Sequence, residues 1–295
     1  MRCGLVGLGH WGKNLYRELG ARLVAVCELD TKVWPTYQRP GLRFTTDLHE
    51  LLDLCDAVYV ATPIGTHYGV ARAALEAKKH VWVEKPFCTD SKLAEELVKL
   101  AQAQGVRLFV GHIMNYHGSF LKVLEWLRQN PGEPILQFIS ERGKVIPNNQ
   151  RHPGDLLFDL APHDLSIMRR LLSGQEVGVH IQGCPQTHVT AHFVFSSEQQ
   201  AFMTWSRTFV QKKASYTLVT PNFMLLFDDT KSDTSEKLLI QHRSTGYQHF
   251  GEPPEECTSP LQNEIQAFLD PAEPYTTGEE GLEVVKLLEV LKQNL

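Results

Sequence analysis

The strongest structural signal in the sequence is the stretch Arg2-Cys3-Gly4-Leu5-Val6-Gly7-Leu8-Gly9-His10-Trp11-Gly12. An apolar run typical of a buried strand leads here into a Gly-x-Gly-x-x-Gly motif and then into an amphipathic segment. In such a motif Gly7 allows a tight turn, Gly9 lets the backbone approach a pyrophosphate, and Gly12 lets a helix pack on the strand. The free N–H groups at the start of that helix attract phosphate. The stretch therefore predicts a dinucleotide site directly after the first strand.

An acidic residue at the end of the second apolar run supports this interpretation. Glu28 follows Leu23–Cys27 and lies about 20 positions after Gly7, as the motif requires. A carboxylate at this place accepts hydrogen bonds from ribose hydroxyls and repels a 2′-phosphate. We therefore expect NAD rather than NADP, although Lys32 nearby leaves NADP open. The alternative is an ordinary strand–helix turn with Glu28 as a surface residue.

The first third of the chain alternates apolar runs with amphipathic segments, which is typical of βαβ units. We expect strands at 2–6, 22–27, 42–44, 57–61, 80–84 and 107–111, and helices at 10–19, 68–77 and 92–104. Uncharged runs such as 57–61 suit strands that are covered on both faces. The pattern predicts an N-terminal Rossmann domain with a doubly wound parallel sheet.

After residue 134 the pattern changes to period-2 alternation broken by turns, which predicts an α+β domain with a mainly antiparallel, open sheet. The expected strands are 134–144, 177–181, 188–195, 200–205, 215–220 and 222–227, with a helix at 155–172 and loops at 228–235 and 248–260. Capping boxes at Ser259 and Thr277 predict two closing helices. We place the domains at 1–116, which binds NAD, and 117–295, which binds substrate and forms a dimer face.

Composition limits the possible partners. The 295 residues are 42% hydrophobic and carry a net charge of −5, so a folded protein is expected without an electrostatic reason to bind nucleic acid or an anionic membrane. No apolar run is long enough to cross a bilayer, and no signal peptide is evident. The six cysteines form no Cys-x-x-Cys pair, which is typical of reduced thiols in a cytoplasmic protein. We expect a cytoplasmic protein.

Two further predicted strands are followed by residues that could bind a ligand or take part in catalysis. Thr62 and Pro63 follow the run 57–61, and Glu84-Lys85-Pro86 follows the run 80–84. Ligands of open α/β sheets lie at the carboxyl ends of the strands. A lysine there can stabilise the alkoxide that develops as a hydride leaves an alcohol carbon. Since Glu-Lys-Pro is a common tripeptide, a structural role for Lys85 is the alternative.

The second half offers one acid–base pair. Asp159 and His163 are four positions apart, which places them on one face of a helix, although Pro162 lies between them. Histidine is the usual general base near neutral pH, and a carboxylate one turn away can orient it. A structural histidine remains the alternative. His188 and His192 have the same spacing in a predicted strand, where about 13 Å separates them, so we expect no metal site.

These motifs together resemble the Gfo/Idh/MocA oxidoreductase family. The matching stretches are Gly7–Gly12, Ala61-Thr62-Pro63 with His67, Glu84–Pro86, and Asp159–Asp164. The resemblance implies NAD or NADP chemistry on sugars and polyols, with Lys85 at the reacting hydroxyl, His163 as the proton acceptor and Asp159 assisting it. It also implies a homo-oligomer, a dimer or tetramer, formed through the open sheet. The motifs and the resemblance assign the cofactor to Gly7, Gly9, His10, Trp11, Gly12, Glu28, Thr62, Pro63, His67, Glu84 and Lys85.

Within that family, the stretches 10–14, 111–112 and 260–269 are similar to members that act at C3 of nucleotide-linked sugars. We therefore expect a sugar or nucleotide-sugar substrate. Four side chains are candidates to bind it, namely Tyr116, Arg142, Lys144 and Arg151. The three cations suit a diphosphate but equally suit a solvated surface. A dehydrogenase of free polyols, and a non-catalytic NAD-sensing protein on the same fold, are the alternatives.

Overall fold

The computed structural model describes residues 1–143, 154–233, 236–249, 259–270, 272 and 274–295. Lys144 and Arg151 lie outside these residues. The chain divides into two compact units. The first unit comprises Met1–His112 and Leu261–Lys286, and the second comprises Ile113–Pro260 and Leu287–Leu295.

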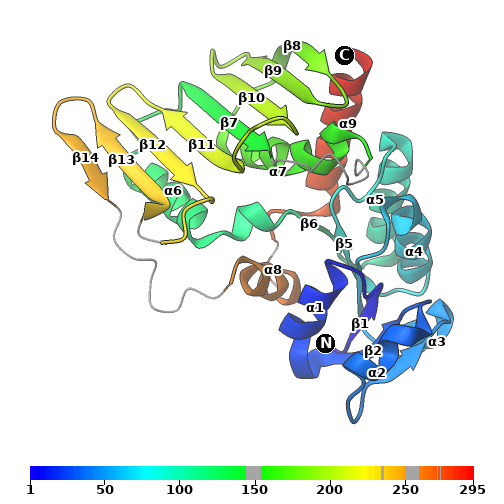
Figure 1. Cartoon of the computed structure of the whole chain (residues 1–295). Coiled ribbons are helices and arrows are strands. Elements are labelled where there is room, and N and C mark those ends of the chain that lie inside the picture. Colours follow the sequence, from blue (N-terminus) through cyan, green and yellow to red (C-terminus); the bar gives the residue numbers. More distant parts are fainter. Residues whose placement is uncertain (144–153, 234–235, 250–258, 271, 273) are drawn as a thin grey trace. The chain divides into compact units, whose positions relative to one another are not determined.

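The first unit contains a parallel sheet with the strand order β3-β2-β1-β4-β5-β6 (Figure 1). Its strands are β1 (Cys3–Val6), β2 (Leu23–Cys27), β3 (Arg43–Thr45), β4 (Ala57–Val60), β5 (His80–Glu84) and β6 (Leu108–Gly111). This is the Rossmann order, so the prediction of a doubly wound parallel sheet is confirmed. The direction of winding reverses between β1 and β4.

Helices cover both faces of this sheet. They are α1 (Gly12–Leu19), α2 (Trp34–Tyr37), α3 (Leu48–Leu54), α4 (Ile64–Glu76), α5 (Ser91–Gln104), α8 (Pro260–Leu269) and the first part of α9 (Gly278–Gln293). Strand residues such as Val58 and Val83 share a buried cluster with α3, α4 and α5. On the opposite face, Tyr59 and Phe109 contact Phe268 of α8, with ring centroids 5.3 and 5.4 Å apart. In Figure 1, α4 and α5 lie on one side of β5 and α8 on the other.

The C-terminal segment differs from the expected domain division. The predicted boundary assigned everything after residue 116 to the second domain, whereas residues 261–286 group with the first unit. Close packing explains the difference. A Cβ atom added to Gly278 would lie 2.7 Å from Leu108, and one added to Gly281 would lie 2.4 Å from Val110. The segment therefore completes the covering of the parallel sheet.

The second unit is built on one large sheet with the order β14-β13-β12-β11-β7-β10-β9-β8 among the described residues. The strands are β7 (Gln137–Gly143), β8 (Glu176–Cys184), β9 (His188–Phe195), β10 (Gln200–Ser206), β11 (Lys213–Val219), β12 (Phe223–Asp228), β13 (Leu238–His242) and β14 (Gly246–His249). Among the strands that the structure describes in this unit, only β7 and β10 pair in parallel, so the prediction of a mainly antiparallel sheet is confirmed. The predicted strands omitted β13 and β14, which are short and follow a polar turn.

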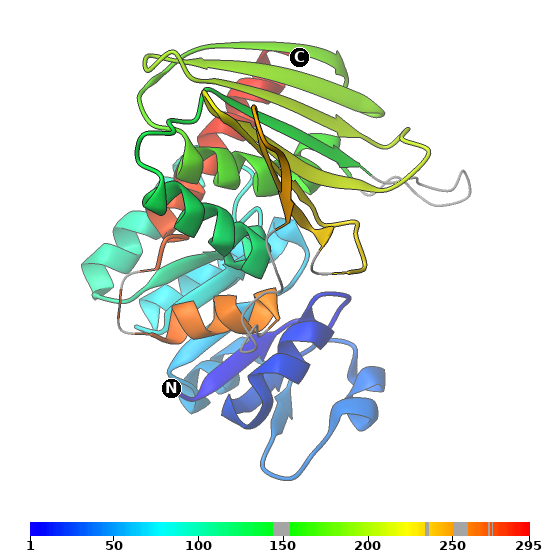
Figure 2. The same ribbon diagram turned by 90° about the vertical axis from the view of Figure 1, so that its left-hand side faces the viewer.

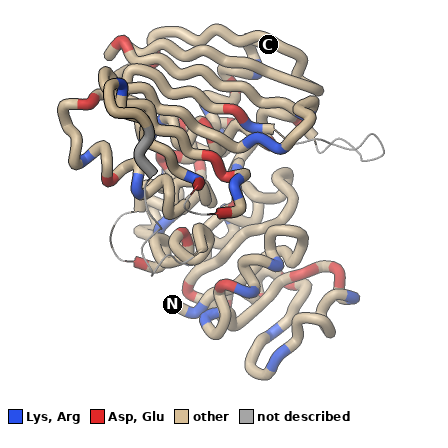
Figure 3. The backbone as a smooth tube through the Cα atoms, turned by 60° about the vertical axis from the view of Figure 1, so that its left-hand side comes forward, with Lys and Arg blue, Asp and Glu red and all other residues tan. Residues whose placement is uncertain are grey.

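One face of this sheet is covered by helices. Alternate residues of β10, including Met203 and Trp205, are buried, whereas Phe202 and Thr204 point to the other face. The helices α6 (Gly118–Gln129) and α7 (Leu156–Leu171) lie along the covered face (Figure 2). Figure 3 shows few Lys, Arg, Asp or Glu residues along the strands of this sheet. None of the described helices is long and apolar enough to cross a membrane.

Candidate functional site

The glycine motif of the first unit forms the turn between β1 and α1. Gly7 has φ of +92°, and a Cβ atom there would lie 2.7 Å from the carbonyl oxygen of Ala61. A Cβ atom on Gly12 would lie 2.1 Å from the carbonyl oxygen of Gly7. By contrast, a Cβ atom on Gly9 would meet no atom of the described residues within 4 Å. Two glycines are therefore required by the turn itself, and the third leaves the backbone open to a ligand.

The carboxylate of Glu28 lies beside this turn. One oxygen accepts a hydrogen bond from the backbone N–H of Leu8 at 2.6 Å, and the other accepts one from the N–H of Asp30 at 2.8 Å. Each carboxylate oxygen can accept more than one hydrogen bond, so Glu28 keeps acceptor capacity for a ligand. The predicted pairing of the glycine motif with an acidic strand end is therefore present in the structure.

A cavity of about 540 Å³ lies at the carboxyl ends of β1, β2 and β4. Five of the predicted residues line it together, namely Gly7, Gly9, Glu28, Thr62 and Pro63. Apolar side chains such as Leu29 and Leu48 make up much of the rest of its wall. The cavity thus combines an apolar wall with a carboxylate and an open stretch of backbone.

His10 and Trp11 fall in the glycine turn itself. His10 is exposed, and Trp11 is partly buried at the N-terminal end of α1.

Lys85 follows β5, the next strand of the same sheet edge. Its backbone N–H donates to the Glu84 carboxylate at 2.7 Å, and the Lys85–Pro86 peptide bond is cis. Burial raises the pKa of Glu84 to about 7, against the opposing effects of Lys85 and the nearby Trp11. His112 is only 1% exposed, and burial together with the charge of Lys85 lowers its pKa to about 3. The lysine therefore lies beside one carboxyl group and one neutral imidazole.

A second carboxyl group near Glu84 was not expected from the sequence as a site residue. Glu264 of α8 is fully buried, and neither of its oxygens has a hydrogen-bond partner among the described residues. Burial, with a further contribution from Glu84, raises its pKa well above the usual range. The sequence feature that could have indicated Glu264 is a carboxylate on the apolar face of a predicted helix, which it shares with Leu261 and Phe268.

His67 differs in environment from the residues that line the cavity. It lies in the first turn of α4 and is 2% exposed. Its Nε2 lies 2.7 Å from the carbonyl oxygen of Thr62, and its Nδ1 lies 3.1 Å from that of Pro86. Burial lowers its pKa, while the two carbonyl contacts act in the opposite direction.

In the second unit, Asp159 and His163 lie on α7, which continues through Pro162 to Leu171. Asp155 caps the helix by accepting a hydrogen bond from the N–H of Leu157 at 2.9 Å. The i, i+4 spacing is therefore kept in a continuous helix, and Asp159 and His163 share one face.

Arg207 is a functional candidate that sequence reasoning missed. Its guanidinium lies 3.6 Å from Asp159 and donates to the carbonyl oxygen of Gly154 at 3.0 Å. Arg207 is 6% exposed and follows β10. No local pattern predicts this ion pair, because α7 and β10 are far apart in the sequence.

Arg142 is buried and donates hydrogen bonds to other side chains of the second unit. It is 9% exposed, its Nε donates to Asp164 at 2.8 Å, and a second nitrogen donates to Tyr216. Asp164 also accepts a hydrogen bond from the Trp205 indole at 2.7 Å. These buried contacts engage the guanidinium that was expected to meet a diphosphate. Tyr116 is buried in the short helical turn Ile113–Tyr116.

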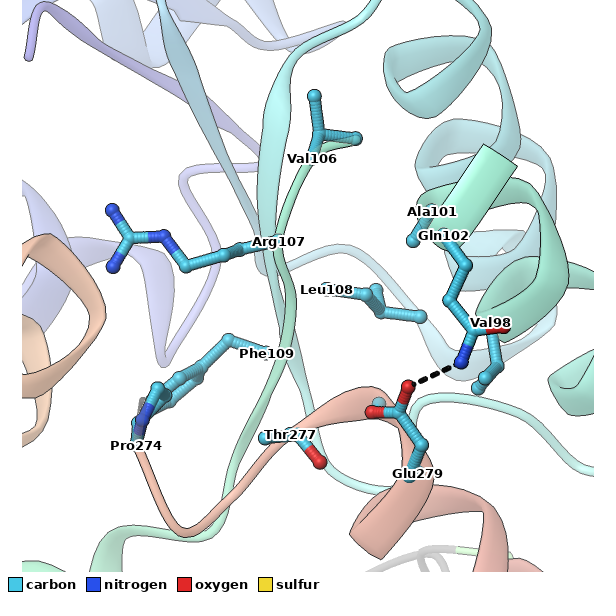
Figure 4. Close-up of a pocket in the computed structure, with 11 residues that line it drawn as sticks. Val98, Ala101, Gln102, Val106, Arg107, Leu108, Phe109, Pro274, Thr277 and Glu279 are labelled. Carbon is cyan, nitrogen blue, oxygen red and sulfur yellow. Dashed lines mark hydrogen bonds between the residues drawn. The ribbon is translucent and has the colours of Figure 1, made fainter. Parts of the chain in front are cut away.

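Figure 4 shows another cavity of the first unit, of about 310 Å³, between α5, β6 and the start of α9. Gln102 donates to Glu279 across it at 2.8 Å. None of the predicted site residues that the structure describes lines this cavity. The described residues contain no group of three or more metal-ligating side chains.

Comparison with known proteins agrees with this description of the first unit. The family model GFO_IDH_MocA, described as an oxidoreductase family with an NAD-binding Rossmann fold, matches residues 1–112. Residues 1–112 are therefore similar to the Gfo/Idh/MocA oxidoreductase family.

Two curated relatives and one solved structure illustrate what this chain is similar to. UDP-N-acetylglucosamine 3-dehydrogenase of Acidithiobacillus ferrooxidans is 29% identical over 198 residues, 62% of this chain and 58% of that protein. Inositol 2-dehydrogenase of Cereibacter sphaeroides is 26% identical over 190 residues, 61% of this chain and 57% of that protein. Both alignments thus span less than two thirds of the relative's own length. A solved structure of the Acidithiobacillus enzyme is similar in fold, with a TM-score of 0.89 and 24% identity over 100% of this chain and 97% of that one.

Proposed function

We propose that this protein is an NAD-dependent oxidoreductase that transfers hydride between the nicotinamide and a secondary alcohol carbon of a sugar. We further propose that the sugar is nucleotide-linked and reacts at C3, as in a UDP- or dTDP-sugar. The observation that carries the proposal is the cavity shared by Gly7, Gly9, Glu28, Thr62 and Pro63, with Lys85 at the end of the adjacent strand β5. The similarity to a UDP-N-acetylglucosamine 3-dehydrogenase supports the choice of substrate class.

The residues of the first unit fit a dinucleotide. The open backbone at Gly9 and the N-terminus of α1 suit a pyrophosphate, which carries negative charge. Glu28 suits the ribose hydroxyls and repels a 2′-phosphate, which favours NAD over NADP. The apolar wall near Leu29 and Leu48 suits the adenine.

The proposed reaction assigns a role to three side chains. The bound nicotinamide supplies the hydride acceptor in the oxidative direction. Lys85 donates a hydrogen bond to the substrate oxygen and stabilises the alkoxide as the C–H bond breaks. His163 accepts the hydroxyl proton, and Asp159 orients and supports the imidazole. Loss of one hydride and one proton converts the alcohol to a ketone, and the reverse reaction returns both.

The direct test is a substrate panel with purified protein and NAD, followed by the absorbance of reduced nicotinamide. UDP-sugars, dTDP-sugars, myo-inositol and free aldoses form the panel, and thermal shifts rank their binding. We expect turnover with a nucleotide sugar. Turnover with inositol alone would identify a free-polyol dehydrogenase, the activity named for the Cereibacter relative. Tight NAD binding without any turnover would identify a sensor.

We also propose a cytoplasmic homo-oligomer, formed through the face of the large sheet that carries Phe202 and Thr204. His192 stacks on Phe202 there, with ring centroids 4.3 Å apart. The buried free thiols, Cys3, Cys27, Cys55 and Cys88, support a reducing compartment. Light scattering after size-exclusion chromatography tests the assembly, and Phe202→Glu is expected to yield monomers.

A further inference from the structure

The ring of His67 contacts the backbone at the ends of two adjacent strands. Thr62 follows β4 and Pro86 follows β5, and these strands pair in parallel, so both segments lie at the same sheet edge. His67 reaches the carbonyl oxygen of Thr62 at 2.7 Å and that of Pro86 at 3.1 Å. At 2% exposure, the side chain is enclosed by protein. The imidazole thus spans two segments that carry predicted site residues.

The two contacts of the His67 ring require hydrogen-bond donors. A carbonyl oxygen only accepts hydrogen bonds, so each ring nitrogen must carry a proton to bond to its carbonyl. A neutral imidazole has one N–H and can donate to one of the two carbonyl groups, whereas a protonated ring can donate to both. In either form, the ring occupies the space between the two carbonyl groups and limits their movement. No apolar side chain can supply these donors.

The backbone of Lys85 is held next to this link. Its N–H donates to Glu84 at 2.7 Å, and the carbonyl of the following residue, Pro86, faces His67. The Lys85 backbone is therefore restrained on both sides. A shift of about 1 Å in a catalytic group is enough to lower a rate severely.

We propose that His67 is a positioning residue whose ring ties the carboxyl ends of β4 and β5 together and so fixes the backbone that carries Lys85. The inference rests on the proposed function only in giving Lys85 a catalytic role. Its structural part concerns the first unit alone. It also separates His67 from the cofactor-binding set, because the ring nitrogens face backbone carbonyl groups.

Amide hydrogen exchange tests the structural part without any need for activity. In His67→Leu, exchange of the peptide that spans residues 84–88 is expected to rise by about tenfold, which corresponds to the loss of about one buried hydrogen bond. Peptides from β2 are expected to be unchanged. The control is His49→Gln, an exposed histidine of the same unit. Unchanged exchange at 84–88, or an equal rise in every peptide, would overturn the proposal.

His67→Gln provides a second variant, since its amide can donate to one carbonyl group. It is expected to fold and to show a smaller rise in exchange at 84–88, so the proposal stays testable if His67→Leu does not fold. An exchange rate in His67→Gln equal to that of the unmodified protein, together with an unfolded His67→Leu, would contradict a role at Lys85.

Kinetics test the link to Lys85. In His67→Leu we expect kcat to fall by about tenfold or more, while the Kd of NAD and the KM of the sugar stay nearly unchanged. His67→Gln is expected to recover part of kcat. Equal losses in kcat and in NAD affinity would instead indicate a direct cofactor contact. If the unmodified protein transfers no hydride, the proposed function fails, whereas the exchange measurement still decides the role of His67.

Discussion

Glu28 accepts a hydrogen bond from the backbone N–H of Leu8 at 2.6 Å, which joins the end of β2 to the turn after β1. Because Leu8 lies between Gly7 and Gly9, the carboxylate is held against the part of the chain that is expected to meet the cofactor. One side chain therefore both supports the glycine turn and places a negative charge beside the expected ribose.

Replacing Glu28 with serine is expected to weaken the preference for NAD. The change removes the charge that repels a 2′-phosphate, so the ratio of the NADP Kd to the NAD Kd should fall by about tenfold or more. Titration of each cofactor against the variant measures the ratio. Glu18→Ser, at an acidic position of α1 away from the cavity, is the control. An unchanged ratio in Glu28→Ser would remove Glu28 from cofactor selection.

The glycines offer a matched pair of substitutions. Gly12→Ala places a methyl group 2.1 Å from the carbonyl oxygen of Gly7, so we expect a loss of about 1–3 kcal/mol in the free energy of unfolding. Gly9→Ala has free space, and it should fold normally but bind NAD about tenfold more weakly. Thermal unfolding with and without NAD separates the two effects. A stability loss confined to Gly9→Ala, together with an NAD-affinity loss confined to Gly12→Ala, would contradict the proposed roles.

The charge on Arg207 is expected to affect the acid–base pair of α7. Its guanidinium lies 3.6 Å from Asp159, so Arg207→Met leaves the carboxylate to act on His163 without a competing cation. The acid limb of the kcat/KM profile should then move to higher pH by about one unit, since a stronger carboxylate effect favours the protonated imidazole. Arg207→Lys keeps the charge and should shift the limb less. Superimposable profiles for all three proteins would contradict the expectation.

The raised pKa of Glu84 predicts how the free energy of unfolding changes with pH. Burial raises its pKa from 4.5 to about 7, so the folded chain keeps a proton that the unfolded chain loses. The contribution of Glu84 to stability therefore falls as the pH rises through that window. Relative to Glu84→Gln, the free energy of unfolding should drop by up to about 3 kcal/mol between pH 4.5 and pH 7.

Urea unfolding at a series of pH values measures this difference. Glu125→Gln, at an exposed position of α6, is the control and should show no such trend. Curves for Glu84→Gln that run parallel to those of the unmodified protein would show that Glu84 ionises normally.

The local features of the first unit could be predicted from the sequence. Apolar strands followed by glycine, acid or lysine are local patterns, and the observed strands begin and end within one or two residues of the expected positions. Gly7, Gly12 and Glu28 follow from spacing because the geometry of the turn demands them. The helix that contains Asp159 was expected for the same reason, since its period is local.

Contacts between side chains that are far apart in the sequence could not be predicted. Arg142 was expected to bind a diphosphate because the sequence around an arginine does not reveal its partner. Its hydrogen bonds to Asp164 and Tyr216 depend on how β7, α7 and β11 pack. Arg207 was missed for the same reason. Residues 261–286 return to the first unit through contacts with β6, which a division by sequence order does not reveal.

The central claim is that Lys85 takes part in hydride transfer, and Lys85→Ala tests it most directly. Single-turnover formation of reduced nicotinamide should fall by about a thousandfold in the variant, because a charge that stabilises the developing alkoxide is lost. The Kd of NAD should remain nearly the same. Transfer at the rate of the unmodified protein would contradict the account.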